Sequence, residues 1–506
     1  MLMDADACYR ALVTRDSRFD GRLFVGVKTT GIYCRPICPA RTPKRENVTF
    51  FATATAAQAA GFRPCLRCRP ESSPDLAAWR GTSNTVSRAL ALIEAGALDE
   101  ADVEGLATRL GVGERQLRRL FRRHLGASPI SVAQTRRVLL AKQLIHQTLL
   151  PMTEVALASG FGSVRRFNET FQRLYDRPPA RLRRQSGEAP AGEDGVRLDL
   201  AYRAPYDWEA LTDFLRMRAI EGVEVVSLAG YARTVAFGED NGLLTVTPSP
   251  KADRLSVTIR FPRLGALPAI IARVRRVFDL TADPAAIVEH LSRDPALAPR
   301  VAARPGLRVP GAWDGFELAV RAILGQQISV GAATLLAGRI VREWGEPLPA
   351  TLAGVVPGLT HVFPSAERLA GADLSVLPMP RARSSALKTL ASAVAADATL
   401  FEGHGDLSAA IARLKALPGI GEWTAQYIAM RQLREPDAFP TGDIGLLRAM
   451  AGADGRRPTT QALQARAEAW RPWRAYAALH LWTGEVIADP LARALDEKSP
   501  DDRKAA

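Results

Sequence analysis

Cysteine is scarce in this sequence and unevenly placed. All five cysteines lie within the first 68 residues, and the following 438 residues contain none. A disulfide framework is therefore not what we expect. In the cytoplasm a small cluster of cysteines more often binds a metal ion.

Long hydrophobic runs are also missing. No stretch of about 18 uncharged apolar residues occurs, which excludes a membrane-spanning helix of the usual kind. The N-terminus, MLMDADACYR, lacks the charged and apolar regions of a signal peptide. We therefore expect a cytoplasmic protein without a membrane partner.

Excess charge is absent from the longer, C-terminal part of the chain. Residues 188–506 carry 37 basic and 37 acidic side chains, whereas residues 1–187 carry 30 and 16, so the whole net charge of +14 lies in the first part. This confinement favours a polyanion as the partner of that part. A merely solvated basic surface is the alternative.

The length of 506 residues and the changes in texture along the chain predict four domains. The first is rich in Cys, Pro and Arg, the second is helical and basic, the third has an α/β pattern, and the fourth is helical. Residues 184–195 and 71–75 are predicted breaks, and the polar tail from Asp496 is predicted to be disordered. The predicted domains are 1–78, 80–187, 196–303 and 304–490.

The cysteines form two close pairs, Cys34-x3-Cys38 and Cys65-x2-Cys68, separated by 26 residues. Four thiolates from two such pairs can meet at one tetrahedral Zn²⁺, so we predict a zinc site with these four ligands. Most four-cysteine sites are purely structural, and spacing alone favours that role. Cys8 lies outside the pattern and is predicted to be a buried thiol.

The segment VKTTGIYCRPICPARTPKRENVTFFATATAAQAAGFRPCLRCRP resembles the N-terminal zinc domain of the Ada family, bacterial methyl-phosphotriester repair proteins and response regulators. The resemblance covers about residues 8–75 and includes all four ligands. It implies that Cys34 is both a zinc ligand and the acceptor of a methyl group from DNA. Four thiolates on one Zn²⁺ leave a local charge of −2, which keeps the sulfur ionised and nucleophilic.

Cationic side chains near these ligands are candidates to hold the flanking phosphates. They are Arg35, Arg41, Lys44, Arg45, Arg63, Arg67 and Arg69. We further expect methylation of Cys34 to remove one negative charge and so to strengthen DNA binding by this part of the chain.

Residues 103–129 and 153–179 repeat one plan: a helix, a Gly-containing turn and a second helix with a basic face. The second helix of a helix-turn-helix enters the major groove. The tandem, including GFGSVRRFNETFQ, resembles the AraC-type DNA-binding domain, and solvation of a helix face is the alternative for each arginine. The candidate base readers are Gln116, Arg118, Arg119, Ser163, Arg165 and Arg166.

The segment LKALPGIGEWTAQYIAM carries a hairpin, LPGIG, between two predicted helices. The backbone N–H groups of such a turn, with Gly419 and Gly421, can hold a DNA phosphate without cationic side chains. A lone G-x-G is weak, but FPTGDIGLLRAM places one carboxylate, Asp443, in a Gly-flanked turn soon after it. From about residue 196 to RPWRAYAALHLW the chain resembles the helix-hairpin-helix DNA glycosylases of the AlkA type, 3-methyladenine DNA glycosylase II.

This resemblance implies a catalytic role for Asp443. Its carboxylate would stabilise positive charge on the sugar as the base leaves and would help to orient water. An N-cap or turn aspartate is the alternative. Trp423 and Tyr427 share a helix face and, with Trp482, would stack on an electron-poor alkylated base, although ordinary core aromatics are the alternative.

Departures from related proteins refine the expectation. Glycosylases that also cut the backbone have a lysine just after the hairpin, where this chain has Trp423, so we predict a monofunctional enzyme. Some relatives bind an iron–sulfur cluster, which we do not expect here. A leucine fills the gap left by the flipped base in the AlkA type, and the matching position is Gln327. The Pro-Cys-His-Arg motif of alkylguanine methyltransferases is absent, which argues against O6-alkylguanine repair.

We therefore predict a multidomain, mainly α fold with α+β parts: a small zinc domain, a tandem helix-turn-helix domain, an α/β sheet domain and a helix-hairpin-helix glycosylase domain. The predicted function is excision of 3-methyladenine-class bases, combined with methyl transfer to Cys34 and transcriptional activation. One alternative is a transcription factor with structural zinc and an inactive glycosylase-like half; another is an active glycosylase with an unresponsive regulator. We expect a monomer that engages promoter DNA, alkylated DNA and RNA polymerase.

Overall fold

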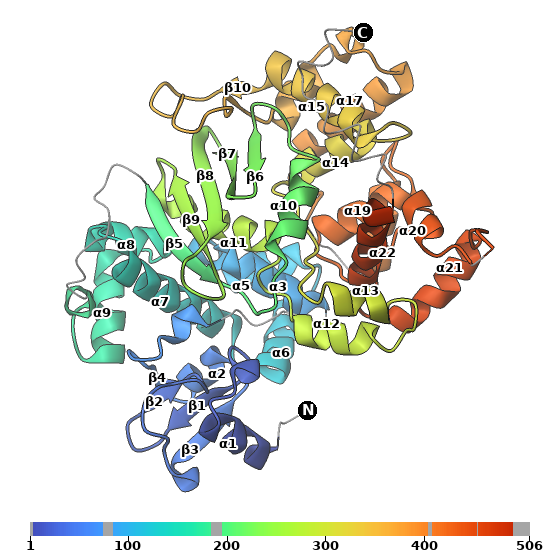
Figure 1. Cartoon of the computed structure of the whole chain (residues 1–506). Helices are drawn as coiled ribbons and strands as arrows, with labels where there is room; N and C mark the ends of the chain where they lie inside the picture. Colours follow the sequence, from blue (N-terminus) through green and yellow to red (C-terminus); the bar gives the residue numbers. More distant parts are fainter. Residues whose placement is uncertain (1–3, 74–83, 184–194, 403–406, 453, 489–506) are drawn as a thin grey trace.

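The computed structural model describes residues 4–73, 84–183, 195–402, 407–452 and 454–488. These residues form a small N-terminal domain, a block of helices, a five-stranded sheet with helices against it, and a second helical region (Figure 1). The predicted tail, and the predicted break at 184–195 except for Gly195, lie outside the described residues. Within these ranges no helix is long and apolar enough to cross a membrane.

The N-terminal domain is built on a four-stranded sheet of order β3-β1-β2-β4. Strands β2 and β4 run parallel, with Ile32 opposite Arg63, so the segments that follow both strands leave the same edge. The predicted break at 71–75 begins instead with a 3-10 turn, η3 (Pro70–Ser72), that packs on helix α7 (Pro129–Gln147). The other elements are α1 (Ala5–Val13), β1 (Phe24–Val27), β2 (Ile32–Cys34), β3 (Val48–Phe51), α2 (Ala54–Ala59) and β4 (Arg63–Pro64).

The block of helices contains both predicted helix-turn-helix units. Leu106, Leu117 and Phe121, which recur at helical spacing, are buried in the first unit. One long helix, α7, joins the two units and contacts the N-terminal domain through α2 and η3. The helices are α3 (Asn84–Glu94), α4 (Ala97–Glu100), α5 (Val103–Arg109), α6 (Glu114–Leu125), α7 (Pro129–Gln147), α8 (Met152–Ala158) and α9 (Val164–Tyr175).

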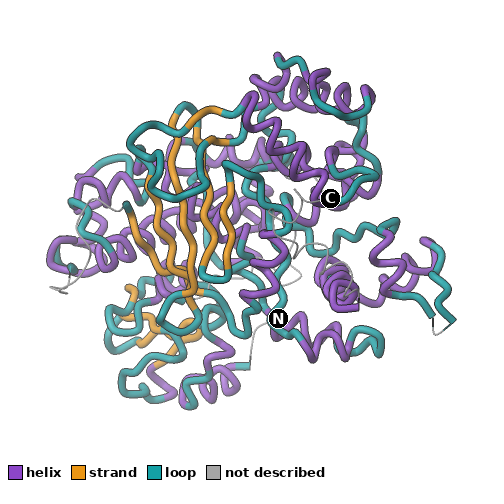
Figure 2. The backbone as a smooth tube through the Cα atoms, turned by 45° about the horizontal axis from the view of Figure 1, so that its top comes forward, coloured by secondary structure: helices purple, strands orange, loops and turns teal. Residues whose placement is uncertain are grey.

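The central sheet has the strand order β5-β9-β8-β7-β6, and every neighbouring pair is antiparallel. Figure 2 shows the five strands side by side with helices around them. The α/β character expected from the sequence therefore takes an α+β form. Its elements are β5 (Val196–Ala201), α10 (Trp208–Arg216), β6 (Glu224–Ser227), β7 (Gly230–Phe237), β8 (Asp240–Pro248), β9 (Arg254–Arg260), α11 (Leu267–Val277), α12 (Pro284–Leu291) and α13 (Ala298–Ala303).

One hydrophobic core spans the sheet and the second helix-turn-helix unit. It includes Phe161 of that unit and Leu198 of the edge strand β5. Helix α7 also satisfies the free edge of β5, because Gln147 Oε1 accepts from the Asp199 N–H at 2.9 Å and Gln143 Nε2 donates to the Asp199 carbonyl at 3.0 Å. The boundary predicted near residue 187 is thus crossed by shared packing.

The C-terminal region is a helical domain with its own core. A minor two-stranded sheet, β10 with β11, lies beside β7. The elements are α14 (Gly315–Leu324), α15 (Val330–Trp344), β10 (Glu346–Pro347), β11 (His361–Val362), α16 (Ala366–Gly371), α17 (Arg381–Ala396), α18 (Leu407–Lys415), α19 (Glu422–Arg431), α20 (Ile444–Ala449), α21 (Thr460–Ala467) and α22 (Arg474–Ala488).

Candidate functional site

The four predicted ligands meet at one point. Parallel pairing of β2 with β4 places the turn containing Cys34 and Cys38 beside the turn containing Cys65 and Cys68. All four Sγ atoms lie within 4.8 Å of one another. A compact set of four sulfur donors is what a tetrahedral Zn²⁺ requires, so the residues fit the metal and the predicted zinc site is confirmed.

The surroundings of the sulfurs distinguish Cys34 from the other ligands. Cys34 is half-buried, whereas Cys38, Cys65 and Cys68 are buried. The Arg35 N–H donates to Cys68 Sγ and the Arg67 N–H donates to Cys65 Sγ, each at 3.3 Å. Backbone donors therefore serve two buried sulfurs, and Cys34 is the most exposed of the four ligand residues.

Arg35, predicted to bind phosphate, is instead a buried structural residue, only 8% exposed. Its Nε donates to Asp20 at 2.7 Å and its Nη1 donates to the Cys68 carbonyl at 3.2 Å. The guanidinium therefore fastens the ligand loop to the domain. The sequence could not reveal this because Asp20 lies 15 residues upstream.

The other cations near the zinc site differ in availability. Arg41, Lys44 and Arg67 are exposed, and Arg63 and Arg69 are half-buried. Arg45 lies over the rings of Tyr9 and Phe50, at 5.8 and 5.4 Å from their centroids, and 3.4 Å from Asp6. Arg41, Lys44 and Arg67 thus offer the most accessible charge for phosphate.

The second helix of each helix-turn-helix unit presents a basic face to solvent. In α6, Gln116 and Arg119 are exposed, and Arg118 is half-buried and paired with Glu114 at 2.5 Å. In α9, Arg165 and Arg166 are exposed, and Arg165 pairs with Glu169 at 2.8 Å. Ser163 is the N-cap of α9, accepting from the Arg166 N–H at 3.2 Å, so its hydroxyl is engaged in the fold.

The hairpin LPGIG joins α18 to α19, as the sequence predicts. Gly419 has φ +84°, and a Cβ there would lie 2.5 Å from Ala386 Cβ, so both conformation and space require glycine. Gln326 Nε2 donates to the Gly419 carbonyl at 2.8 Å, which ties the hairpin to the loop after α14. Gly421 is the exposed N-cap position of α19, where its backbone is open to a phosphate.

Asp443 is half-buried at the N-terminus of α20 and accepts three hydrogen bonds. Its Oδ1 accepts from the Leu446 N–H at 3.0 Å and from Trp482 Nε1 at 2.9 Å, while its Oδ2 accepts from Trp423 Nε1 at 2.8 Å. The carboxylate is therefore an N-cap and also the point where α19, α20 and α22 converge.

The three predicted aromatic residues do come together around Asp443. The rings of Trp423 and Tyr427 are stacked, with centroids 5.0 Å apart and planes at 13°. Trp482, on α22, donates to the other oxygen of the same carboxylate. All three rings are half-buried, so they are neither sealed in the core nor fully exposed.

Two arginines beside Tyr427 were missed by the sequence analysis. Arg431 Nη1 donates to the Tyr427 hydroxyl at 2.6 Å, and Arg431 Nε donates to the Pro310 carbonyl at 2.8 Å. Burial alone would raise the pKa of Tyr427, but Arg431 and Arg218 outweigh it and lower that pKa below its ordinary value. In the sequence, the one sign of the contact between Arg431 and Tyr427 is that they lie one helical turn apart. The contact of Arg218 gives no such sign, because Arg218 belongs to the sheet domain.

Gln327 lies exposed in the loop between α14 and α15 with φ +60°, a left-handed conformation that is uncommon outside glycine. The preceding residue, Gln326, bonds the hairpin at Gly419, so Gln327 stands next to the hairpin. The side chain of Gln327 is therefore exposed beside the hairpin, on a backbone conformation that costs free energy.

The comparisons with known proteins agree with this division of the chain. Residues 7–71 match the family described as the metal binding domain of Ada, residues 106–185 a helix-turn-helix domain, and residues 197–314 the AlkA N-terminal domain.

Curated relatives extend the match over almost the whole chain. The "Probable bifunctional transcriptional activator/DNA repair enzyme AlkA" of Mycobacterium tuberculosis is 43% identical over 484 residues, 95% of this chain and 96% of that protein. DNA-3-methyladenine glycosylase 2 of Escherichia coli is 36% identical, over 56% of this chain and 96% of its own length. The bifunctional activator and repair enzyme Ada of Escherichia coli is 40% identical, over 24% of this chain and 34% of its own. The chain belongs to the family of AlkA-type bifunctional transcriptional activators and DNA repair enzymes.

Proposed function

We propose that the C-terminal part of this protein removes alkylated bases of the 3-methyladenine class from DNA by hydrolysis of the N-glycosidic bond. The observation that carries the proposal is the convergence of three hydrogen-bond donors on Asp443, two of them indoles. Such donors hold the carboxylate at one point before any substrate arrives, which is what electrostatic stabilisation of a transition state requires.

The proposed reaction begins with extrusion of the damaged nucleotide from the duplex. As the bond between sugar and base breaks, positive charge develops on the sugar, and the fixed negative charge of Asp443 stabilises it. The electron pair of that bond leaves with the base, water adds to the sugar carbon, and its extra proton passes to solvent. Trp423 stands where a Schiff-base lysine would be needed for strand cleavage, so the enzyme is proposed to be monofunctional.

The aromatic residues are proposed to bind the extruded base. N-alkylated purines are cationic or electron-poor, so they stack favourably on the electron-rich faces of Trp482 and Tyr427. Gln327 is proposed to enter the gap left in the duplex, where its amide can hydrogen-bond the unpaired opposite base. Gly419 and Gly421 are proposed to hold the neighbouring phosphate through their backbone.

We propose a second activity at the zinc site. When bound, Zn²⁺ keeps the four cysteine sulfurs as thiolates. Cys34 Sγ attacks the methyl carbon of a methyl phosphotriester; the new S–C bond forms as the O–C bond breaks, and the phosphodiester recovers its negative charge. Exposed Arg41, Lys44 and Arg67 are proposed to hold the adjacent phosphates.

The helix-turn-helix units are proposed to carry the methylated protein to promoter DNA, with Gln116, Arg119 and Arg166 as readers and RNA polymerase as partner. We further propose that the protein acts as a monomer in the cytoplasm. The alternative, a DNA-binding protein whose glycosylase-like half is inactive, is decided by the next experiment.

Asp443→Asn tests the excision activity. The substitution removes the charge but keeps an oxygen that can accept from Leu446, so we expect release of 3-methyladenine to be abolished while zinc content and duplex binding remain. Free base released from methylated DNA is measured by chromatography. Near wild-type release by the variant, or no release by the wild type, would refute the proposal.

Cys34→Ser tests the methyl acceptor. Incubation with DNA containing methyl phosphotriesters should add one methyl group to the wild-type protein at Cys34 and none to the variant, as read by peptide mass spectrometry. Excision of alkylated bases should continue in the variant because its site lies in another domain. A methyl group found on Cys38, Cys65 or Cys68 instead would overturn the assignment.

A further inference from the structure

Two ion pairs join the helix-turn-helix block to the two ends of the helix-hairpin-helix. Arg109, at the end of α5, donates Nε and Nη2 to the Glu402 carboxylate at 3.0 and 2.6 Å. Arg88 of α3 lies 3.6 Å from Glu435. Glu402 precedes α18 and Glu435 follows α19, so the two pairs bracket the element whose opposite end is the DNA-binding hairpin.

The backbone at Glu402 is fastened to α18. Arg413, in the last turn of that helix, donates Nη2 to the carbonyls of Thr399 at 2.8 Å and Glu402 at 3.4 Å. A displacement of Glu402 is therefore passed to α18 through Arg413. Along α18 and α19 the hairpin is about 15 Å away, given the rise of ~1.5 Å per residue.

The backbone at Glu435 is fastened to α19 in the same way. The Glu435 N–H donates to the Ala429 carbonyl at 3.0 Å, and the Phe439 N–H donates to Gln426 Oε1 at 3.0 Å. Phe439 begins the short turn that ends at Asp443. Glu435 is thus fastened to the end of α19 and bears on the direction of that helix, while Asp443 is held separately by its own three donors.

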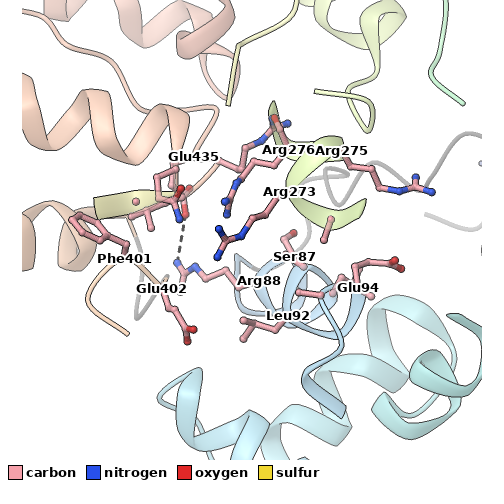
Figure 3. A pocket seen from close by; sticks show the side chains of 18 of the residues that line it. Ser87, Arg88, Leu92, Glu94, Arg273, Arg275, Arg276, Phe401, Glu402 and Glu435 are labelled. Atoms are coloured by element: carbon pink, nitrogen blue, oxygen red, sulfur yellow. Dashed lines mark hydrogen bonds and ion pairs between the residues drawn. The ribbon is translucent and has the colours of Figure 1, made fainter. Parts of the chain in front are cut away.

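Both ion pairs lie beside a large cavity between the helix-turn-helix block and the C-terminal domain. A cavity of about 1910 Å³ separates the helix-turn-helix block from the sheet and C-terminal domains, and Arg88, Arg109, Glu402 and Glu435 all line it. Figure 3 shows Arg88 extending across this space to Glu435. The helix-turn-helix block shares an apolar core with the sheet, and α3 also packs on α11 beside this cavity, whereas Arg88–Glu435 and Arg109–Glu402 are ion pairs that link the block to the C-terminal domain.

We propose that Arg88 and Arg109 are positioning residues for base excision: the helix-turn-helix block holds both ends of the helix-hairpin-helix and thereby sets the hairpin for binding damaged DNA. The inference rests on the excision activity proposed above. The hairpin binds a phosphate equally well in the enzyme–substrate complex and in the transition state. Loss of its positioning therefore weakens binding of the damaged duplex, which raises KM, and leaves kcat for bond breaking unchanged.

To test this inference, the charges of the half-exposed pair Arg109–Glu402 are exchanged in the full-length protein. Arg109→Glu and Glu402→Arg are made singly and together, and KM and kcat for release of 3-methyladenine are measured. We expect each single reversal to raise KM about fivefold with kcat unchanged, a coupling at the lower end of the usual range. The double exchange restores the ion pair with reversed polarity and should restore KM.

A matched control uses an exposed pair of residues four apart in the chain. Glu289→Arg and Arg293→Glu change the net charge by the same amounts, but this pair, 3.2 Å apart at the C-terminal end of α12, spans no domain contact. Its reversals should leave KM unaltered. The melting temperature of every variant is recorded so that measurements are made on folded protein.

A second readout does not require turnover. The ratio of affinities for a duplex with an abasic-site analogue and for the same undamaged duplex should fall about fivefold in the single variants and recover in the double. Unspecific binding by the basic domains contributes equally to both affinities and so cancels in their ratio. Because the ratio needs no turnover, it tests the positioning role even if the protein proves not to excise bases. Unchanged KM and affinity ratio in the single variants, a fall in kcat at constant KM, or no recovery in the double exchange would each overturn the inference.

Discussion

Asp443 shows how one side chain serves the fold and the site together. The bond from the Leu446 N–H places the carboxylate at the start of α20, and the indoles of Trp423 and Trp482 fix its direction. The N-cap interpretation and the catalytic interpretation of this residue are therefore compatible. Because the donors come from three helices, the position of the charge depends on the packing of the whole C-terminal domain.

His480, two residues before Trp482 on α22, is a buried titratable group in that packing. It is 4% exposed, and its Nδ1 has no hydrogen-bond partner within the described part of the chain. Burial, with a smaller contribution from the charge of Arg300, lowers the pKa of His480 to about 4. The folded protein therefore holds this imidazole neutral at pH values where the unfolded chain protonates it.

A pH dependence of stability follows at the residue scale. Between pH 4 and 6.5 the unfolded chain binds more protons at His480, so the free energy of unfolding falls as the pH falls, by about 2 kcal/mol at pH 5. His480→Leu should remove this part of the slope. Urea unfolding of both proteins at pH 5 and 7.5 measures it, and equal slopes would show that His480 does not contribute.

At the scale of the element, α6 and α9 have the same design. Each begins after a short turn, buries large apolar side chains on one face, Leu117 and Phe121 in α6 and Phe167 and Phe171 in α9, and exposes arginines on the other. In each helix one arginine is paired with a glutamate one turn away, Arg118 with Glu114 and Arg165 with Glu169. Arg119 and Arg166 have no such ion pair among the described residues, so their charge is fully available to a phosphate.

Arg119→Ala should therefore weaken DNA binding more than Arg118→Ala. For a phosphate contact we expect the slope of log K against log salt to fall by about one, because one fewer counterion is released. Arg118→Ala should change the slope less, since it also frees Glu114. Fluorescence anisotropy with one duplex at several salt concentrations measures both, and identical slopes for the two variants would contradict this difference.

At the scale of the whole molecule, α7 is the element that all the N-terminal parts share. It contacts the zinc domain, carries both helix-turn-helix units and bonds the edge strand β5. In the C-terminal half of α7, Lys142, completely buried, lies 2.7 Å from Glu71, whose side chain is 1% exposed and which follows the last zinc ligand by three residues. Tyr175, at the end of α9, lies over the same ammonium at 5.7 Å.

Lys142→Met should destabilise the protein by about 3–5 kcal/mol, because it leaves the Glu71 carboxylate buried without its main counterion. Adding Glu71→Gln should recover part of this loss. Lys251→Met is the control, since Lys251 pairs with Asp199 at the same distance but is 69% exposed, and should cost less than about 1 kcal/mol. Chemical unfolding measures all three, and equal effects of the two lysine variants would contradict the buried-pair argument.

The sequence by itself determined the local features of this protein. The two cysteine pairs, the tandem helix-turn-helix units, the LPGIG hairpin and Asp443 were all recognisable because each depends on residues close together in the chain. Helical spacing likewise placed Trp423 and Tyr427 on one face, and the structure stacks them.

Only the tertiary structure decided the partners that come from afar. Arg35 hydrogen-bonds Asp20 in the interior, and Trp482 hydrogen-bonds Asp443, 39 residues away in the chain. In the predicted break after Pro70, Glu71 is paired with Lys142. The meeting of Arg109 with Glu402 spans 293 residues. Spacing along the chain reports only which side chains share a face. The partner that a charged or polar side chain finds is set by how the domains pack, because a buried charge must be paired wherever that packing brings it.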